Sequence, residues 1–179
     1  ILVPQSQVSS LRDDAMAILG SGQANGGCSL LHAAGLGYGA SIGLDLPLAV
    51  RLLDRPSKRD LDDPDGLLPA IIDAWLAGGF KLPNDLAKEE LYWAVISQVP
   101  PRQGLKSSAA TAIGALRALA EATQSEVSEE EYVAMAAQAQ LDSNISITGS
   151  IDDAWACLTP GWKLIDPQAN SIAEGVLFE

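Results

Sequence analysis

Residues 100–110 read Pro-Pro-Arg-Gln-Gly-Leu-Lys-Ser-Ser-Ala-Ala and separate two apolar stretches of the chain. Residues 91–99, just before them, are rich in β-branched and aromatic side chains and predict a strand that the prolines end. The Ala-rich residues that follow predict a helix over 107–122. A strand, a glycine turn and a helix whose first turn carries hydroxyl groups therefore follow one another here.

A helix that begins at this turn is suited to binding phosphate. It presents the unpaired N–H groups of residues 105–108 together with the positive end of the helix dipole. Lys106 adds a mobile positive charge, and a serine hydroxyl can reach a magnesium ion on the phosphates. The alternative is an ordinary serine-capped helix. A Walker A loop is excluded, because its spacing needs glycine where Pro100 and Leu105 stand.

Residues 148–154 form a second motif, Thr-Gly-Ser-Ile-Asp-Asp-Ala. On a helix, the adjacent carboxylates of Asp152 and Asp153 are expected to point to different sides, one toward a substrate hydroxyl and the other toward the loop or solvent. A carboxylate near an acceptor oxygen can orient it and take its proton during phosphoryl transfer. Taken alone, the pair is better explained as a complement to the helix dipole. The two motifs together favour phosphoryl transfer.

Composition narrows the class of protein. Among 179 residues, 47% are apolar and 19% charged, which favours a folded chain. The net charge of −12 argues against nucleic acids and anionic membranes as partners, so an anionic ligand needs a local positive site. Two distant cysteines and a single histidine give little support to a disulfide framework or a Cys/His metal site. Without an apolar run or signal peptide, we expect a cytoplasmic protein.

The chain divides into residues 1–19, which look like a leader or linker with a helix over 11–19, and one domain over 20–179. It opens on Ile1, and we expect it to be part of a longer protein. Glycines over 20–43 predict short strands and tight loops where the backbone comes close to another group. Interleaved strands and helices indicate an α+β or α/β fold. We expect further strands over 41–53, 161–166 and 175–178, a helix over 67–76, a helix opened by the Ser128–Glu131 capping box through Gln140, and a short helix carrying Asp152.

The two motifs resemble those of the archaeal-type shikimate kinases of the GHMP kinase superfamily. Residues 104–108 read Gly-Leu-Lys-Ser-Ser, whereas mevalonate and homoserine kinases usually have Gly-Leu-Gly-Ser-Ser. The lysine at position 106 favours the shikimate kinase branch. Residues 35–46, Gly-Leu-Gly-Tyr-Gly-Ala-Ser-Ile-Gly-Leu-Asp-Leu, are similar to the N-terminal glycine-rich stretch of the same family. The resemblance runs from about Gly22 to Phe178.

The resemblance implies an α+β domain like the second domain of ribosomal protein S5 and a kinase that converts shikimate to shikimate 3-phosphate for chorismate and aromatic amino acid synthesis. ATP and Mg²⁺ would be required. Asp152 falls on the position of the catalytic aspartate, and Lys106 would assist it by neutralising charge. Ser108 matches the magnesium-binding serine, and Asp142 lies near the second acidic metal position. The phosphate loop would comprise Pro101, Gly104, Leu105, Lys106, Ser107, Ser108 and Ala109.

The sequence also departs from the family pattern. Ala109 stands where the family usually has a serine. His32 stands where the family usually has an asparagine, and the histidine could either bind an anionic substrate or have only a structural role. The third glycine-rich motif of the family, which belongs to a C-terminal domain, is not found in these residues. We therefore expect the isolated chain to be weak or inactive and to self-associate through an exposed apolar face. The alternatives are a GHMP kinase for homoserine, mevalonate or another small alcohol, and a non-catalytic nucleotide-binding domain.

Overall fold

A long β-hairpin forms one layer of the protein. Strand β1 (Ile18–Leu31) pairs antiparallel with β2 (Gly39–Leu53) in the computed structural model. The structure describes residues 18–31, 38–57, 61–147, 149, 151–166 and 171–175. The expectations for His32 and for residues 35–37, the start of the glycine-rich stretch 35–46, lie outside these ranges.

Strand β2 is the centre of a five-stranded antiparallel sheet. On the side away from β1, its C-terminal half pairs with β3 (Tyr92–Ser97) and its N-terminal end pairs with β4 (Trp162–Asp166). Strand β4 in turn pairs with β5 (Ser171–Gly175). One long strand therefore links the β3 end of the sheet to the β4–β5 end.

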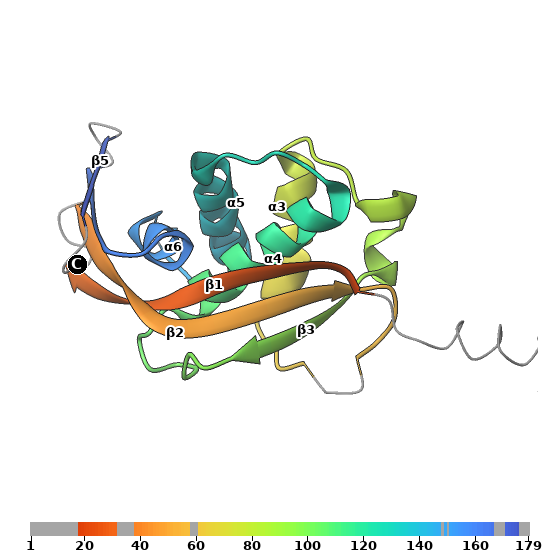
Figure 1. Ribbon diagram of the computed structural model, residues 1–179, viewed down its shortest axis with the longest axis horizontal. Coiled ribbons are helices and arrows are strands. Elements are labelled where there is room, and N and C mark those ends of the chain that lie inside the picture. The colour runs from red at the N-terminus through yellow and green to blue at the C-terminus, as the bar shows by residue number, and fades with distance from the viewer. Residues whose placement is uncertain are drawn as a thin grey trace, which may run out of the picture.

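The helices of the described residues cover one face of this sheet, as Figure 1 shows. An antiparallel sheet with helices on a single face is an α+β architecture, which confirms the fold class expected from the sequence. No helix among the described residues is long and apolar enough to cross a membrane. The helices are α3 (Leu67–Ala77), α4 (Ser107–Thr123), α5 (Glu129–Asp142) and α6 (Ile151–Leu158), with short 3-10 turns at η1 (Pro83–Asp85) and η2 (Lys88–Glu90).

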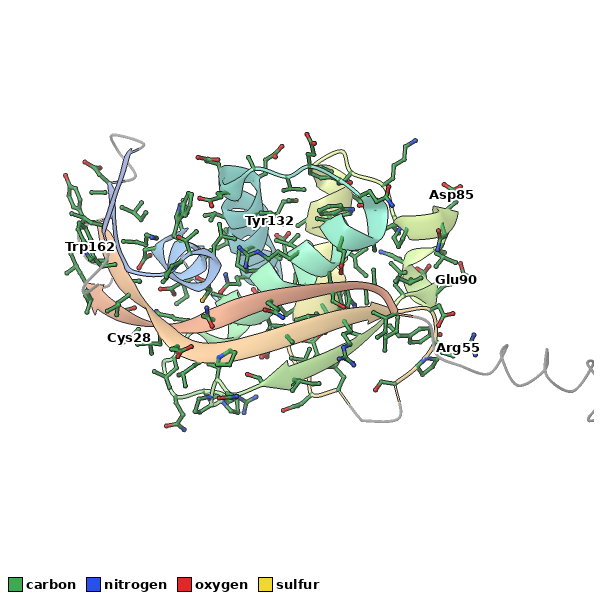
Figure 2. The ribbon with its side chains drawn as sticks, in the orientation of Figure 1. Cys28, Arg55, Asp85, Glu90, Tyr132 and Trp162 are labelled. Carbon is green, nitrogen blue, oxygen red and sulfur yellow. The ribbon has the colours of Figure 1, made fainter. Side chains whose placement is uncertain are left out.

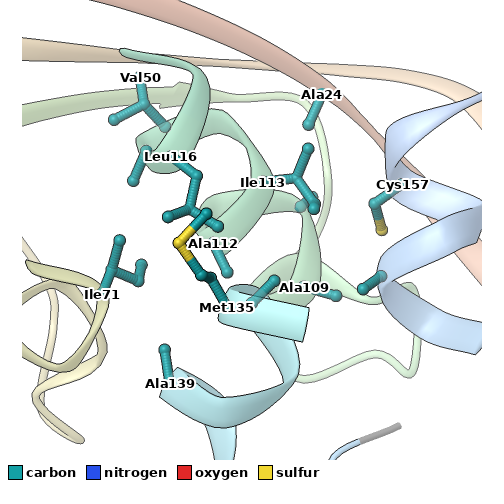
Figure 3. Close-up of a cluster of buried hydrophobic side chains, with 14 of the residues drawn as sticks. Ala24, Val50, Ile71, Ala109, Ala112, Ile113, Leu116, Met135, Ala139 and Cys157 are labelled. Carbon is teal, nitrogen blue, oxygen red and sulfur yellow. The ribbon is translucent and has the colours of Figure 1, made fainter. Parts of the chain in front are cut away.

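Helix α4 lies at the centre of the hydrophobic core. Its small side chains let neighbouring elements approach closely, and Figure 3 shows side chains from several elements gathered around it. The surrounding side chains include Ala24 of β1, Val50 of β2, Ile71 of α3, Met135 of α5 and Cys157 of α6. Because this core holds α4 against the hairpin and α6, it also fixes where the N-terminus of α4 stands.

Gly20 and Gly22 of β1 are required for this packing, because both lie against the backbone of α4. A Cβ atom on Gly22 would lie 1.9 Å from the carbonyl oxygen of Gly114 in α4, so any side chain there would collide with helix backbone. The close approach of the backbone that the sequence predicted here is confirmed, whereas the short strands and tight loops are wrong for β1. The glycines instead form a continuous strand of 14 residues that accepts a helix at close range.

Other local predictions are confirmed. Helices α3 and α4 end one residue beyond their predicted ends, and the capping box of α5 forms, with Ser128 Oγ accepting from the N–H of Glu131 at 3.2 Å. The helix expected over 11–19 is wrong at Ile18 and Leu19, which belong to β1, and its other residues lie outside the described ranges. The last strand was predicted over 175–178, whereas β5 covers Ser171–Gly175 and shares only Gly175 with that prediction; residues 176–178 lie outside the described ranges.

Candidate active site

The loop before α4 ends in a helix N-terminus without a side-chain cap. Lys106 is the N-cap residue and has a left-handed backbone, with φ at 61°. The first helical hydrogen bond runs from the N–H of Ala110 to the Lys106 carbonyl at 2.9 Å, so the N–H groups of residues 107–109 precede the helical ladder. Gly104 also has a positive φ, 73°, which glycine adopts without strain. This geometry suits the binding of an anion.

The side chain of Lys106 points from this loop into an ion pair. Its Nζ lies 2.6 Å from Asp153 Oδ1 and donates a hydrogen bond to Ser29 Oγ at 2.5 Å. The Lys106 and Asp153 side chains are only 13% and 16% exposed. The sequence suggested a mobile charge for the phosphates, whereas the structure shows an ammonium group held between a strand and a helix.

Asp152 is held at the same place by β2. Its carboxylate is 3% exposed and accepts a hydrogen bond of 2.8 Å from Ser41 Oγ, which is itself fully buried. The carboxylate also lies against the backbone of Gly39, where an added Cβ would come within 2.5 Å of Asp152 Cγ. Glycine is therefore required at position 39 for this arrangement of the acid.

The two carboxylates converge, although the sequence predicted that they would point to different sides. Ser41 Oγ lies 2.8 Å from Asp152 Oδ2 and 3.4 Å from Asp153 Oδ1. Both residues belong to the first turn of α6, where Cα–Cβ bonds tilt toward the helix N-terminus, so their carboxylates gather over the same part of the sheet. With Lys106, the group carries two negative charges and one positive charge.

Burial changes the protonation of this cluster. Removal from water raises the pKa of the Asp153 carboxyl above its ordinary value, the hydrogen bond from Lys106 lowers it, and the nearby charge of Asp152 raises it again. Burial also raises the pKa of the Cys157 thiol, whose Sγ lies 3.8 Å from the Lys106 carbonyl oxygen. Cys157 is therefore a protonated packing residue and not a nucleophile.

The residues predicted to bind magnesium lie on two different helices. Ser108 is half-buried in the first turn of α4, whereas Asp142 is exposed at the last turn of α5. Asp142 Oδ1 accepts a hydrogen bond from Gln138 Nε2 at 2.8 Å. Within the described ranges, no group of three or more His, Cys, Asp or Glu residues could hold a metal ion. A magnesium ion at Ser108 would thus depend on oxygens of a bound phosphate.

The structure brings together some of the predicted residues and adds others that the motifs did not indicate. Lys106 and Asp152 belong to one cluster, because Lys106 contacts Asp153 and Ser41 contacts both acids. Lys106 also contacts Ser29 of β1. Cys28, which Figure 2 labels, directly precedes Ser29 and marks this end of the sheet. Ser29 and Ser41 were not predicted. Ser41 lies within the quoted glycine-rich stretch, but a single serine in a strand gives no signal of its role. The predictions for Thr148 and Ser150 lie outside the described ranges.

Comparisons with known proteins agree with this fold. A family model, GHMP kinases N terminal domain, matches residues 74–161. The shikimate kinase of Methanocella arvoryzae is 35% identical over 83 residues, which cover 46% of this chain and 29% of that protein. The shikimate kinase of Pyrococcus abyssi is 25% identical over 160 residues, covering 81% of this chain and 56% of that protein.

A solved structure, Lactococcus lactis galactokinase complexed with galactose, has the same fold, with a TM-score of 0.69 and 14% identity over 96% of this chain and 52% of that one. The family match over residues 74–161 and the shared fold show that the chain has the fold of a GHMP kinase N-terminal domain. Its relatives include archaeal shikimate kinases, as the sequence motifs indicated. The chain spans about half, or less, of the length of these curated relatives.

Proposed function

We propose that the protein transfers the γ-phosphate of ATP to a hydroxyl of shikimate, giving shikimate 3-phosphate on the route to chorismate and the aromatic amino acids. The observation that carries the proposal is the contact between the phosphate loop and the acid pair, where Lys106 Nζ lies 2.6 Å from Asp153 Oδ1. The choice of shikimate is supported by the curated relatives. The cluster itself suits any small alcohol.

The N-terminus of α4 is the proposed site for the phosphates of ATP. Backbone N–H groups of residues 107–109 would donate to phosphate oxygens, and the helix dipole would favour their negative charge. A Cβ on Gly104 would meet no atom of the described residues within 4 Å, so the loop is open on this side. Pro101, Leu105 and the first-turn residues Ser107, Ser108 and Ala109 would complete the loop around the phosphates.

Ser108 and Asp142 are the proposed protein ligands of Mg²⁺, which would neutralise charge on the phosphates. The donor chemistry fits this ion, because hydroxyl and carboxylate oxygens are ligands that magnesium prefers. Asp142 is exposed and bonded only to the neutral amide of Gln138 among the described residues, so it can exchange this bond without a large loss of hydration.

Asp152 is the proposed general base. It would accept the proton of the acceptor hydroxyl while the new oxygen–phosphorus bond forms and the bond to ADP breaks. Asp153 Oδ1 is already bound to the Lys106 ammonium, whereas among the described residues Asp152 is held only by the neutral hydroxyl of Ser41. Lys106 would offset one of the two negative charges and so reduce repulsion of the incoming phosphates.

An assay of ADP release with a panel of acceptors tests the proposal. The protein, expressed from its complete reading frame, is offered shikimate, homoserine, mevalonate and galactose with ATP and Mg²⁺. Turnover with shikimate alone supports the proposal. Turnover with another acceptor and not shikimate supports the second candidate, a GHMP kinase for a different small alcohol, which the shared fold of a galactose-bound galactokinase favours.

Calorimetry on the 179-residue chain separates catalysis from simple binding. ATP binding without turnover by the protein from the complete reading frame would support the third alternative, a non-catalytic nucleotide-binding domain.

We propose in addition that the protein is cytoplasmic and that the isolated chain self-associates. Ile147 and Ile151 are 98% and 41% exposed near the start of α6, and size-exclusion chromatography measures whether such apolar residues pair two copies.

A further inference from the structure

The cluster at the end of the sheet is organised by a pair of serines that the proposed chemistry does not use. Ser29 of β1 and Ser41 of β2 are direct cross-strand partners in the antiparallel ladder. Residues opposite each other in such a ladder have side chains on the same face of the sheet. Because Ser41 is fully buried beneath α6, both hydroxyls lie on the helix-covered face.

Each serine holds a different part of the cluster. Ser29 Oγ accepts a hydrogen bond from Lys106 Nζ at 2.5 Å, so it fixes the side chain that comes from the phosphate loop. Ser41 Oγ lies 2.8 Å from Asp152 Oδ2 and 3.4 Å from Asp153 Oδ1, so it fixes the start of α6. The two strands therefore determine how far Lys106 stands from the acids.

Lys106 connects the same two regions through its backbone. Its carbonyl oxygen accepts the first helical hydrogen bond of α4, from Ala110, and lies 3.8 Å from Cys157 Sγ in α6. The neighbouring residue Leu105 accepts a hydrogen bond from the N–H of Gly27 in β1 at 3.1 Å. The loop, the hairpin and α6 thus meet at a few short contacts, and a small shift of one changes the position of the others.

We propose that Ser29 and Ser41 are positioning residues that set the geometry between the phosphate loop and the acid pair for phosphoryl transfer. This inference rests on the proposed function for its kinetic consequence. Neither serine would touch ATP or the acceptor. Ser29 would act through Lys106, and Ser41 through Asp152 and Asp153.

Kinetics of alanine variants provide the first test. Misplacement of reacting groups by about 1 Å can cost about 100-fold in rate, so Ser29→Ala and Ser41→Ala should lower kcat about 10- to 100-fold while KM for both substrates changes about twofold or less. Ser29→Thr, which keeps the hydroxyl, should restore kcat. Ser21→Ala, an exposed serine on the same strand, is the matched control and should leave kcat unchanged. Unchanged kcat in both site variants would overturn the inference.

A second test does not depend on the acceptor. Carboxyl ¹³C NMR of the protein should show that Ser41→Ala shifts the resonances of Asp152 and Asp153, that Ser29→Ala shifts only Asp153, and that Ser21→Ala shifts neither. If neither site variant shifts a carboxyl resonance beyond the control, the positioning role is wrong. If the resonances shift as expected but no acceptor is turned over, the proposed function fails and the positioning inference stands.

Discussion

Replacing Lys106 with methionine tests the ion pair at the centre of the site. Methionine keeps most of the aliphatic stem but removes the ammonium that lies 2.6 Å from Asp153 Oδ1. Loss of one partner from a buried ion pair costs about 3 to 5 kcal/mol, because the other charge stays buried without compensation. The two side chains are 13% and 16% exposed, so we expect Lys106→Met to lower the free energy of unfolding by about 2 to 3 kcal/mol near pH 7.

Urea denaturation measures this loss, and the chain contains a matched control. Lys88 forms an ion pair of 3.2 Å with Asp73, but those side chains are 51% and 57% exposed, so Lys88→Met should cost less than about 1 kcal/mol. Adding Asp153→Asn to Lys106→Met should recover part of the loss, since no charge is then stranded. Lys106→Met losing no more stability than Lys88→Met, with no coupling to Asp153, would refute the reasoning.

Two further predictions concern packing and pH. Gly22→Ala should lower the free energy of unfolding by about 3 kcal/mol or more, because the added Cβ meets the backbone of Gly114. Gly78→Ala is the control and should cost about 1 kcal/mol or less, because its added Cβ meets only side-chain atoms, at 3.2 Å. Equal losses in urea denaturation would contradict the close packing of α4 on β1. Because burial raises the pKa of the Asp153 carboxyl, the folded protein holds the carboxyl proton more tightly than the unfolded chain does. This proton therefore stabilises the fold at pH values below the ordinary carboxyl pKa, and the stabilisation is lost as pH rises through the raised pKa. The unfolding free energy of the wild type, measured relative to Asp153→Asn, should therefore fall as pH rises, and a rise would contradict the direction of the shift.

Local sequence signals predicted the helices because their causes are local. The capping box of Ser128 and Glu131 lies within four residues, and the glycines after α3 directly follow its last turn. The long strand β1 could not be predicted in this way. Gly20 and Gly22 are explained by the backbone of α4, more than ninety residues further along the chain, so local patterns suggested short strands and tight loops.

In the candidate site too, local features could be predicted from the sequence, whereas tertiary contacts could not. The residues of the phosphate loop and of the acid pair could be found by their motifs, because each motif is contiguous in sequence. Which side chains touch could not be predicted. The contacts of Lys106 with Ser29 and Asp153, and the convergence of both acids on Ser41, join segments that only the tertiary fold brings together.

The most direct test of the proposed chemistry is shikimate-dependent ADP release by the wild-type protein, by Asp152→Asn and by Lys106→Met, with the phosphorylated product identified by ³¹P NMR. The wild type should release one ADP for each shikimate 3-phosphate formed. Asp152→Asn should lose about 100-fold or more in kcat, since a general base contributes about 10² to 10⁴ in rate. Turnover without dependence on shikimate, or an Asp152→Asn variant as fast as the wild type, would contradict the account.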